Sequence, residues 1–190
     1  MHAIDEQIEA LDNLVKELHS SIPEIEKASI IIKNCLENNG KILIAGNGGS
    51  SSDAMHFAAE LVGNFINKER KALPAIALSS NQSTLTSISN DSGFENVFKR
   101  QMEALASEND VFIGISTSGK SLNIVKALQY ARNNGLKTIG LCGGYKDEML
   151  GYCDVLLSVN SECTPRIQEC HILIIHILCS LIEDIFIKEK

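Results

Sequence analysis

The sequence has little of what marks a nucleic-acid-binding protein. Among its 190 residues, 17 Lys and Arg oppose 24 Asp and Glu, which gives a formal net charge of -7 at pH 7. Nonspecific binding to a phosphate backbone depends on clustered cations. Lys68, Arg70 and Lys71 form the only dense basic run, and we interpret this run as a solvated helix end. We therefore expect no nucleic-acid partner.

Signals of secretion and of membrane insertion are also absent. The six cysteines form no Cys-x-x-Cys pair, and several stand in apolar runs, where a free thiol behaves as a small hydrophobic group. The first residues are acidic and periodic, unlike a signal peptide. The most apolar stretch, residues 170–182, covers 13 residues, whereas a bilayer requires about 20. The sequence thus predicts a reduced, cytoplasmic protein with no membrane partner.

Apolar residues recur at helical spacing in the first part of the chain and in short unbroken runs after it. Two helices are expected, from Ile4 to Leu18 and from Pro23 to about Asn39, packed as an antiparallel hairpin. From Lys41 onward, unbroken apolar runs separated mostly by helical segments are typical of buried parallel strands. These runs are KILIA, PAIAL, DVFIGIS, KTIGLC and DVLLSV.

The length of the chain and these runs predict one α/β domain over residues 1–190, with helices in 1–39 and a core in 40–190 that ends in a long helix. Crossover helices on both faces of a five-stranded parallel sheet produce a three-layer αβα sandwich. Ligands of such sheets bind beyond the carboxyl ends of the strands. The loops after KILIA, PAIAL and DVFIGIS are therefore the expected location of a functional site.

Two of these loops combine small residues with hydroxyl groups. The loop GNGGSSS, residues 46–52, has no GK[ST] ending and carries Ser51 where a dinucleotide fingerprint requires a third glycine, so no nucleotide cofactor is expected. The loop STSGKS, residues 116–121, repeats the hydroxyl pattern. Ser and Thr often cap helix N-termini, which would explain either loop alone. The two together, on neighbouring strands, favour the binding of one phosphate monoester.

Polar residues in apolar helices mark a second candidate site. His56 and Glu60 share a helix face at i, i+4, where they can bind a divalent metal or divide a proton transfer. In the C-terminal helix, Gln168 and His176 stand eight residues apart among apolar neighbours, and buried polar groups need partners. For His171 we prefer a backbone hydrogen bond in the core, whereas for His176 this interpretation and a catalytic role both stay open.

These motifs resemble those of the sugar isomerase (SIS) domain family over nearly the whole chain. The stretches that carry the resemblance are, in order, GNGGSSSDAMHFAAEL, LPAIAL, SISNDSGF, GISTSGKS and RIQECHILIIH. The resemblance implies a flavodoxin-like SIS fold and an aldose-ketose isomerase that converts sedoheptulose 7-phosphate to D-glycero-D-manno-heptose 7-phosphate for bacterial lipopolysaccharide or capsule biosynthesis. It also implies a homotetramer with active sites at subunit interfaces, and a zinc ion in each subunit.

The resemblance also implies roles for individual residues. Those that would hold the sugar phosphate are Ser50, Ser116, Ser118 and Ser121, with Thr117 beside them. Those that would contact the sugar or shape its pocket are Asn47, Gly48, Gly49, Asn90, Asp91 and Gln168. Those that match zinc-binding positions of family members are His56, Glu60, Gln168 and His176. Glu60 and His176 would form the catalytic acid/base pair.

The chemistry of such an isomerisation fits this acid/base pair. A proton moves between C1 and C2 through an enediol, which requires a base near both carbons and an acid for the oxygens. We assign the carbon-bound proton to Glu60 and the oxygens or ring opening to His176, with the two roles exchangeable. The same domain occurs in non-catalytic relatives that bind a replication initiator or sense sugar phosphates, and the presence of both residues favours the enzyme. An isomerase of a smaller ketose phosphate is a third alternative.

Overall fold

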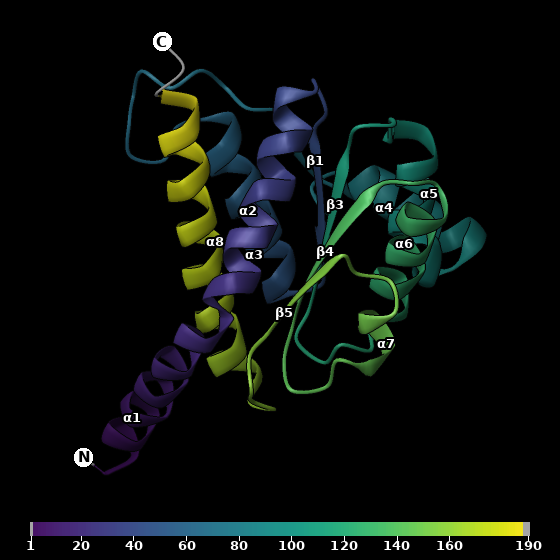
Figure 1. Ribbon diagram of the computed structural model, residues 1–190. Coiled ribbons are helices and arrows are strands. Elements are labelled where there is room, and N and C mark those ends of the chain that lie inside the picture. Colours follow the sequence, from purple (N-terminus) through teal and green to yellow (C-terminus); the bar gives the residue numbers. More distant parts are fainter. Residues whose placement is uncertain (1, 188–190) are drawn as a thin grey trace.

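The computed structural model describes residues 2–187, which form a parallel sheet with helices on both faces (Figure 1). Its five strands within that range are β1 (Ile42–Gly46), β2 (Ala75–Ala77), β3 (Val111–Ser116), β4 (Lys137–Cys142) and β5 (Val155–Ser158). Their order is β2-β1-β3-β4-β5, and all neighbours are parallel. This is the flavodoxin-like order. The predicted αβα fold class and its strands are confirmed.

Two layers of helices enclose the sheet. One face is covered by α2 (Ile22–Glu37), α3 (Gly49–Val62) and α8 (Thr164–Ile187). The other face is covered by α4 (Gln82–Ser92), the 3-10 turn η2 (Phe94–Asn96), α5 (Val97–Leu105), α6 (Leu122–Asn133) and α7 (Asp147–Leu150). Every residue of β1 and β3 is buried. This burial on both faces explains their unbroken apolar sequences.

Alternate strand residues enter different cores. Ile42 and Ile44 of β1 pack with α2, α3 and α8, whereas Leu43 and Ala45 pack with the helices of the opposite face. Successive side chains of a strand point to opposite faces, so a single apolar run contributes to both cores. Packing on both faces of the sheet therefore fixes the positions of the loops at its carboxyl edge.

The N-terminal helices do not form the predicted hairpin. Helix α1 (His2–Glu17) continues through the 3-10 turn η1 (Leu18–Ser21) into α2 as one long bent helix, as Figure 1 shows. Glu17 and Ile22, on either side of the turn, keep right-handed helical backbone angles. Pro23 stands in the first turn of α2, where proline is tolerated, and so does not reverse the chain. As a result, α1 extends past the sheet and packs on α8.

Helix α8 is apolar because it is a core helix. Its 24 residues would suffice to cross a membrane by length and composition alone, yet half of its most apolar window is buried inside the protein. Ile174, Ile175 and Leu178 are fully buried in the core with α2 and α3. The side of α8 that faces α3 carries the polar residues considered next.

Candidate active site

Helices α3 and α8 lie side by side and run in the same direction. Near their first turns, Gly49 lies so close to Gln168 that a Cβ on the glycine would come within 2.5 Å of Gln168 Nε2. Further along both helices, His56 Nε2 lies 3.4 Å from His176 Nε2. The two polar residues singled out on α8 therefore both face α3. Gly49 permits this approach because it has no side chain.

Three of the predicted residues meet in one group. Glu60 Oε1 lies 3.0 Å from His56 Nε2, and the rings of His56 and His176 meet edge to face with centroids 5.0 Å apart. The ring of Phe65 packs on His176 at 5.5 Å. The side chains of His56 and Glu60 are 44% and 23% exposed, so a substrate can reach them. A carboxylate beside two imidazoles supplies the base and the acid that a proton transfer needs.

Asp53 is a fourth polar residue of this group, and the sequence analysis did not identify it. It lines a depression of about 360 Å³ together with His56, Gln168 and Glu169. Its Oδ2 atom is buried and has no hydrogen-bond partner among the described residues. Burial raises the pKa of Asp53 to about 6, a rise that the nearby His56 opposes. Its position three residues before His56, on the same helix face, was the available signal.

The two hydroxyl-rich loops lie next to each other at the carboxyl edge of the sheet. Gly46 at the end of β1 pairs with Ile115 of β3, so the loops that follow these strands are neighbours. Neither α3 nor α6 has a side-chain capping hydrogen bond. The alternative interpretation of the loop hydroxyls as helix caps therefore fails for both helices.

The second loop gathers its own hydroxyls. Ser116 Oγ lies 2.9 Å from Ser121 Oγ and 3.4 Å from Ser118 Oγ. Thr117 contributes its backbone carbonyl to a hydrogen bond from Gly143 N, at 3.0 Å. In the first loop, Ser50 is buried at the start of α3. Several hydroxyl donors beside two helix N-termini form the environment that a phosphate group prefers.

The loops are joined by a residue that the sequence analysis missed. Asn47 and Asn123 exchange two amide hydrogen bonds, each 2.9 Å long, between the first loop and α6. Asn123 is 3% exposed. Its place two residues after STSGKS was the only signal in the sequence. The pair fixes the spacing of the two loops, and Gly48 between Asn47 and α3 adopts a positive φ of 55°.

Asn90 and Asp91 are not brought to the other predicted residues. Both are exposed on α4, where Asn90 Nδ2 donates a 2.8 Å hydrogen bond to Asp91 Oδ1. Within residues 2–187, no hydrogen bond or ion pair joins either side chain to the two loops or to His56, Glu60 and His176. Their assignment to the sugar pocket stays a prediction.

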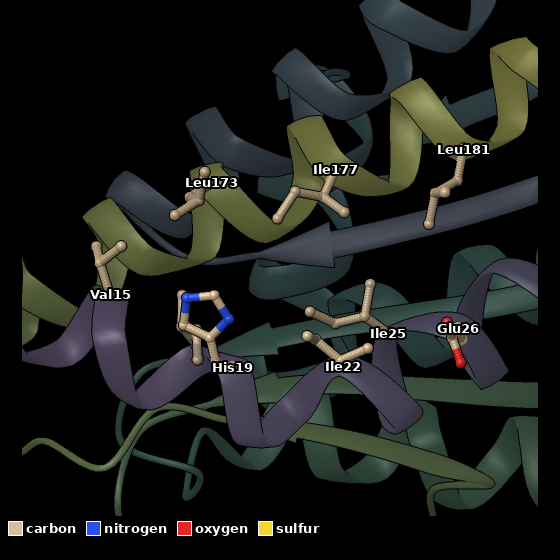
Figure 2. Close-up of a pocket in the computed structure, with 9 residues that line it drawn as sticks. Val15, His19, Ile22, Ile25, Glu26, Leu173, Ile177 and Leu181 are labelled. Atoms are coloured by element: carbon tan, nitrogen blue, oxygen red, sulfur yellow. The ribbon is translucent and has the colours of Figure 1, made fainter.

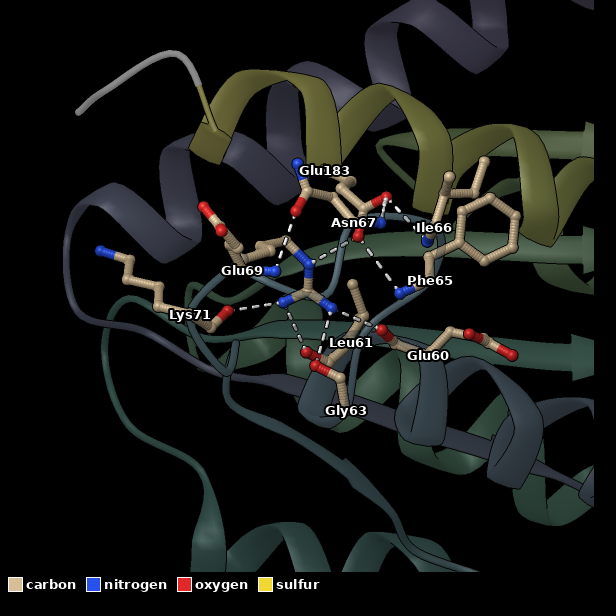
Figure 3. Close-up of polar contacts among 10 residues, drawn as sticks. Glu60, Leu61, Gly63, Phe65, Ile66, Asn67, Glu69, Lys71 and Glu183 are labelled. Atoms are coloured by element: carbon tan, nitrogen blue, oxygen red, sulfur yellow. Dashed lines mark hydrogen bonds and ion pairs between the residues drawn. The ribbon is translucent and has the colours of Figure 1, made fainter.

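The basic run at 68–71 was predicted to be a solvated helix end, and this prediction is wrong because Arg70 is buried. Its guanidinium donates five hydrogen bonds: one to Glu183 Oε1 and four to the carbonyls of Glu60, Leu61, Gly63 and Lys71, which are labelled in Figure 3. Glu183 also accepts from the backbone N–H groups of Phe65, Ile66 and Asn67. Arg70 thereby holds the end of α3, including the backbone of Glu60.

The pKa of Glu183 reflects this environment. Burial alone would raise the pKa of this carboxyl, but the backbone N–H groups of Asn67 and Ile66, together with Arg70, hold it below its usual range. The partner of Arg70 is 113 residues away in sequence, so the basic run gave no indication of the pair.

His171 has the structural role that was preferred for it. The ring is fully buried, and its Nε2 atom lies 3.2 Å from the carbonyl oxygen of Cys142 at the end of β4. Burial lowers the pKa of His171 to about 4, although the hydrogen bond to Cys142 opposes this shift. The imidazole is therefore neutral at neutral pH and lies outside the catalytic group.

The residues expected to bind zinc have suitable donor atoms, but they are not arranged as a formed metal site. Among residues 2–187, no three His, Cys, Asp or Glu side chains form a ready metal-binding group. Two imidazoles and a carboxylate are nonetheless the donors of many catalytic zinc sites. With zinc–ligand bonds of about 2.0–2.1 Å in a tetrahedral arrangement, two neighbouring donor atoms lie roughly 3.4 Å apart. The two His Nε2 atoms are 3.4 Å apart. The donor types at His56, Glu60 and His176 therefore fit zinc, whereas their arrangement in the described residues is not that of a formed metal site.

The fold and the candidate site are those of an α/β protein that isomerises a sugar phosphate. Comparisons with known proteins support this class. The SIS domain profile matches residues 5–143, and the chain belongs to the SIS domain family. A phosphoheptose isomerase of Nitratiruptor sp. is 56% identical over 162 residues, which cover 85% of this chain and 86% of the relative.

Solved structures of phosphoheptose isomerases share the whole architecture. One from Neisseria gonorrhoeae is 40% identical, with a TM-score of 0.86, and covers 96% of each chain. One from Francisella tularensis is 37% identical, with a TM-score of 0.92, and covers 96% of this chain and 97% of the other. The similarity therefore includes the C-terminal helix that carries Gln168 and His176.

Proposed function

We propose that the chain is an isomerase that interconverts sedoheptulose 7-phosphate and D-glycero-D-manno-heptose 7-phosphate in bacterial heptose biosynthesis. The observation that carries the proposal is the accessible group in which the Glu60 carboxylate lies 3.0 Å from His56, while His56 lies 3.4 Å from His176. This group stands on α3, the helix that starts at the first hydroxyl-rich loop. A phosphate site and a proton-transfer site thus share one helix.

In this proposal, Glu60 and His176 divide the proton transfers of the reaction. Glu60 takes the proton from one of the two reacting carbons and returns it to the other, because a carboxylate can reach both from one side of the enediol. His176 donates to and accepts from the neighbouring oxygens. His56, between them, orients Glu60 through the contact at 3.0 Å. The deuterium experiment described below distinguishes this division of roles from the reverse one, in which His176 moves the carbon-bound proton.

The substrate is positioned by the two loops and the pocket between α3 and α8. Ser50, Ser116, Ser118 and Ser121 bind the phosphate with Thr117 beside them, supported by the absence of helix-capping bonds from these loops. Asn47, held by Asn123, and the backbone at Gly48 and Gly49 face the sugar. Gln168, Asn90 and Asp91 complete the proposed set of sugar contacts.

Zinc is proposed as a cofactor on the basis of the donor types. His56, Glu60, Gln168 and His176 would hold it, and a bound zinc ion polarises a carbonyl oxygen and so favours loss of the neighbouring proton. A carboxylate that binds a metal is not free to accept a proton. Glu60 would therefore serve either as a zinc ligand or as the base in a given step, not as both.

We also propose a homotetramer with active sites at subunit interfaces, formed by the entire chain as one SIS domain in the cytoplasm. Ile4, Ile8 and Ile22 on the long N-terminal helix are 67%, 63% and 47% exposed. An apolar cavity of about 360 Å³ lies between η1, α2 and α8, where His19 and Ile22 face Leu173 and Ile177 (Figure 2). Exposed apolar surface of this kind supports association. A monomer in light scattering would contradict the tetramer.

The test is turnover of sedoheptulose 7-phosphate in deuterated water, followed by NMR. Wild type is expected to form the aldose and to place deuterium on the reacting carbon. Glu60→Gln is expected to lose at least about 100-fold in kcat and to stop deuterium incorporation. His176→Ala should slow product formation while still exchanging the carbon-bound proton. If instead Glu60→Gln keeps this exchange and His176→Ala loses it, the roles of Glu60 and His176 are reversed.

Glu108→Gln serves as the matched control. Glu108 is an exposed carboxylate just before β3, at the opposite edge of the sheet from the site. Its replacement should leave turnover unchanged. If wild type binds the sugar phosphate without turnover, with and without added zinc, the chain acts as a binding or sensing member of the SIS family instead.

A further inference from the structure

Lys120 is the only charged side chain in the two loops, residues 46–52 and 116–121. Its ammonium group lies 4.3 Å from the centroid of the Tyr145 ring, within the range of a cation–π contact. Its backbone N–H donates to Ser118 Oγ at 3.2 Å, so the residue is also part of the loop framework. The lysine is exposed at the rim of the proposed phosphate site.

The segment that carries Tyr145 is attached to the second loop by its backbone. Gly143 N donates to the carbonyl of Thr117 at 3.0 Å. A Cβ on Gly119, which adopts a φ of +65°, would lie 1.9 Å from the carbonyl oxygen of Tyr145. The next backbone group, Gly144 N, donates to Ser161 O at 2.8 Å. The backbone of residues 143–145 is therefore held against the second loop and against Ser161, which keeps the aromatic ring next to the loop.

The hydroxyl of the same ring is close to an acid. Hydrogen bonding to Glu162 raises the pKa of the Tyr145 hydroxyl. The segment 143–146 also carries the exposed Lys146.

Apart from Lys120, the two loops themselves offer a dianionic phosphate only neutral hydroxyls and backbone dipoles, on a chain with a net charge of -7. One positive charge at the rim attracts such an anion over several ångströms, and salt screens that attraction. We propose that Lys120, held by Tyr145, is a specificity-determining residue that supplies the cation for the phosphate of the substrate. This inference rests on the proposed function, because it assumes a phosphate in the serine loops.

The test compares kcat and KM for sedoheptulose 7-phosphate at low and high KCl concentrations. At low salt, Lys120→Met is expected to raise KM by about 5-fold with kcat nearly unchanged, and the difference should fall to under about 2-fold at high salt. Lys120→Arg should restore most of the affinity, because it keeps the charge and the contact with the ring. Tyr145→Leu should raise KM by about 2-fold.

Lys68→Met is the matched control, because it removes one exposed positive charge at the other end of α3. Its KM should equal that of wild type. The inference is overturned if Lys120→Met leaves KM unchanged at low salt, if its effect is independent of salt, or if Lys68→Met has the same effect.

Binding of inorganic phosphate, measured by calorimetry, separates this inference from the proposed function. If wild type does not isomerise the sugar but binds phosphate more tightly than Lys120→Met, the isomerase fails and the role of the lysine stands. If wild type isomerises the sugar and both proteins bind phosphate equally, only the lysine inference fails. If wild type binds no phosphate, the inference is overturned too.

Discussion

The contact between α3 and α8 has two polar ends with opposite properties. At the end of α3, Arg70 is 1% exposed in its side chain and donates five hydrogen bonds, one of them to Glu183. Nearer the start of α3, Asp53 Oδ2 is buried without a partner in the described chain, and His56 is 44% exposed in its side chain. The two helices therefore carry one saturated polar cluster and one unsaturated cluster.

The difference separates stability from reactivity. A saturated buried ion pair resists change because removing either partner leaves the other charged and desolvated. Polar atoms without protein partners are available to a substrate or a metal. Glu60 belongs to both clusters, since its backbone carbonyl accepts from Arg70 and its side chain contacts His56. The stable cluster thereby positions the reactive carboxylate.

The largest expected effect is on folding, at the saturated end. Arg70→Met should lower the free energy of unfolding by about 3–5 kcal/mol, because Glu183 and the carbonyls around it lose their donors. Urea denaturation measures this change. Arg100→Met is the control, because Arg100 forms an exposed pair with Glu103 and such pairs contribute less than about 1 kcal/mol. Equal effects of the two variants would contradict the distinction between the clusters.

A pH titration of stability tests a third polar residue of α8. The folded state holds the pKa of His171 at about 4, whereas the ordinary value is 6.5. Between these values the unfolded chain binds more protons, so the stability that is present above pH 6.5 is lost as the pH falls towards 4, by up to about 3 kcal/mol. His171→Gln should lack this slope. A slope shared by wild type and variant would assign the pH dependence to other groups.

At the unsaturated end, the expected effect is on turnover. His176→Gln should reduce kcat by about 100-fold or more, because the amide cannot exchange protons. The free energy of unfolding of this variant should change by less than about 1 kcal/mol, because the His176 ring is partly exposed and does not belong to the saturated cluster of Arg70 and Glu183. Combined kinetics and urea denaturation measure both quantities. A loss of stability comparable to that of Arg70→Met would show that the two ends do not differ as described.

The smallest expected effect concerns the spacing of the loops. Asn123→Ala removes both hydrogen bonds to Asn47 and should raise KM by about 2–10-fold, in line with the modest contribution of neutral hydrogen bonds. Asn134→Ala, at the exposed C-terminal end of the same helix α6, is the control and should leave KM unchanged. An unchanged KM for Asn123→Ala would mean that the loops keep their spacing without the pair.

The sheet and the reactive group were predictable because their signals are local. The central strands β1 and β3 are buried on both faces and so have unbroken apolar runs. His56 and Glu60 share a face through helical spacing alone. The burial of Arg70 was not predictable, because its partner Glu183 is distant in sequence. The prediction of an N-terminal hairpin was wrong because a proline such as Pro23 is compatible both with the start of a separate helix and with the first turn after a bend in a continuing one. The spacing between Asn47 and Asn123 likewise depends on the complete sheet.

The ends of the sheet have a consequence for the newly made chain. The two outermost strands are also its shortest, with three residues in β2 and four in β5. A short outer strand exposes few unpaired backbone groups to which another chain could add a strand. Strand-to-strand aggregation between copies of the chain is thereby disfavoured, whereas the helices keep exposed apolar side chains such as Ile4 and Ile8.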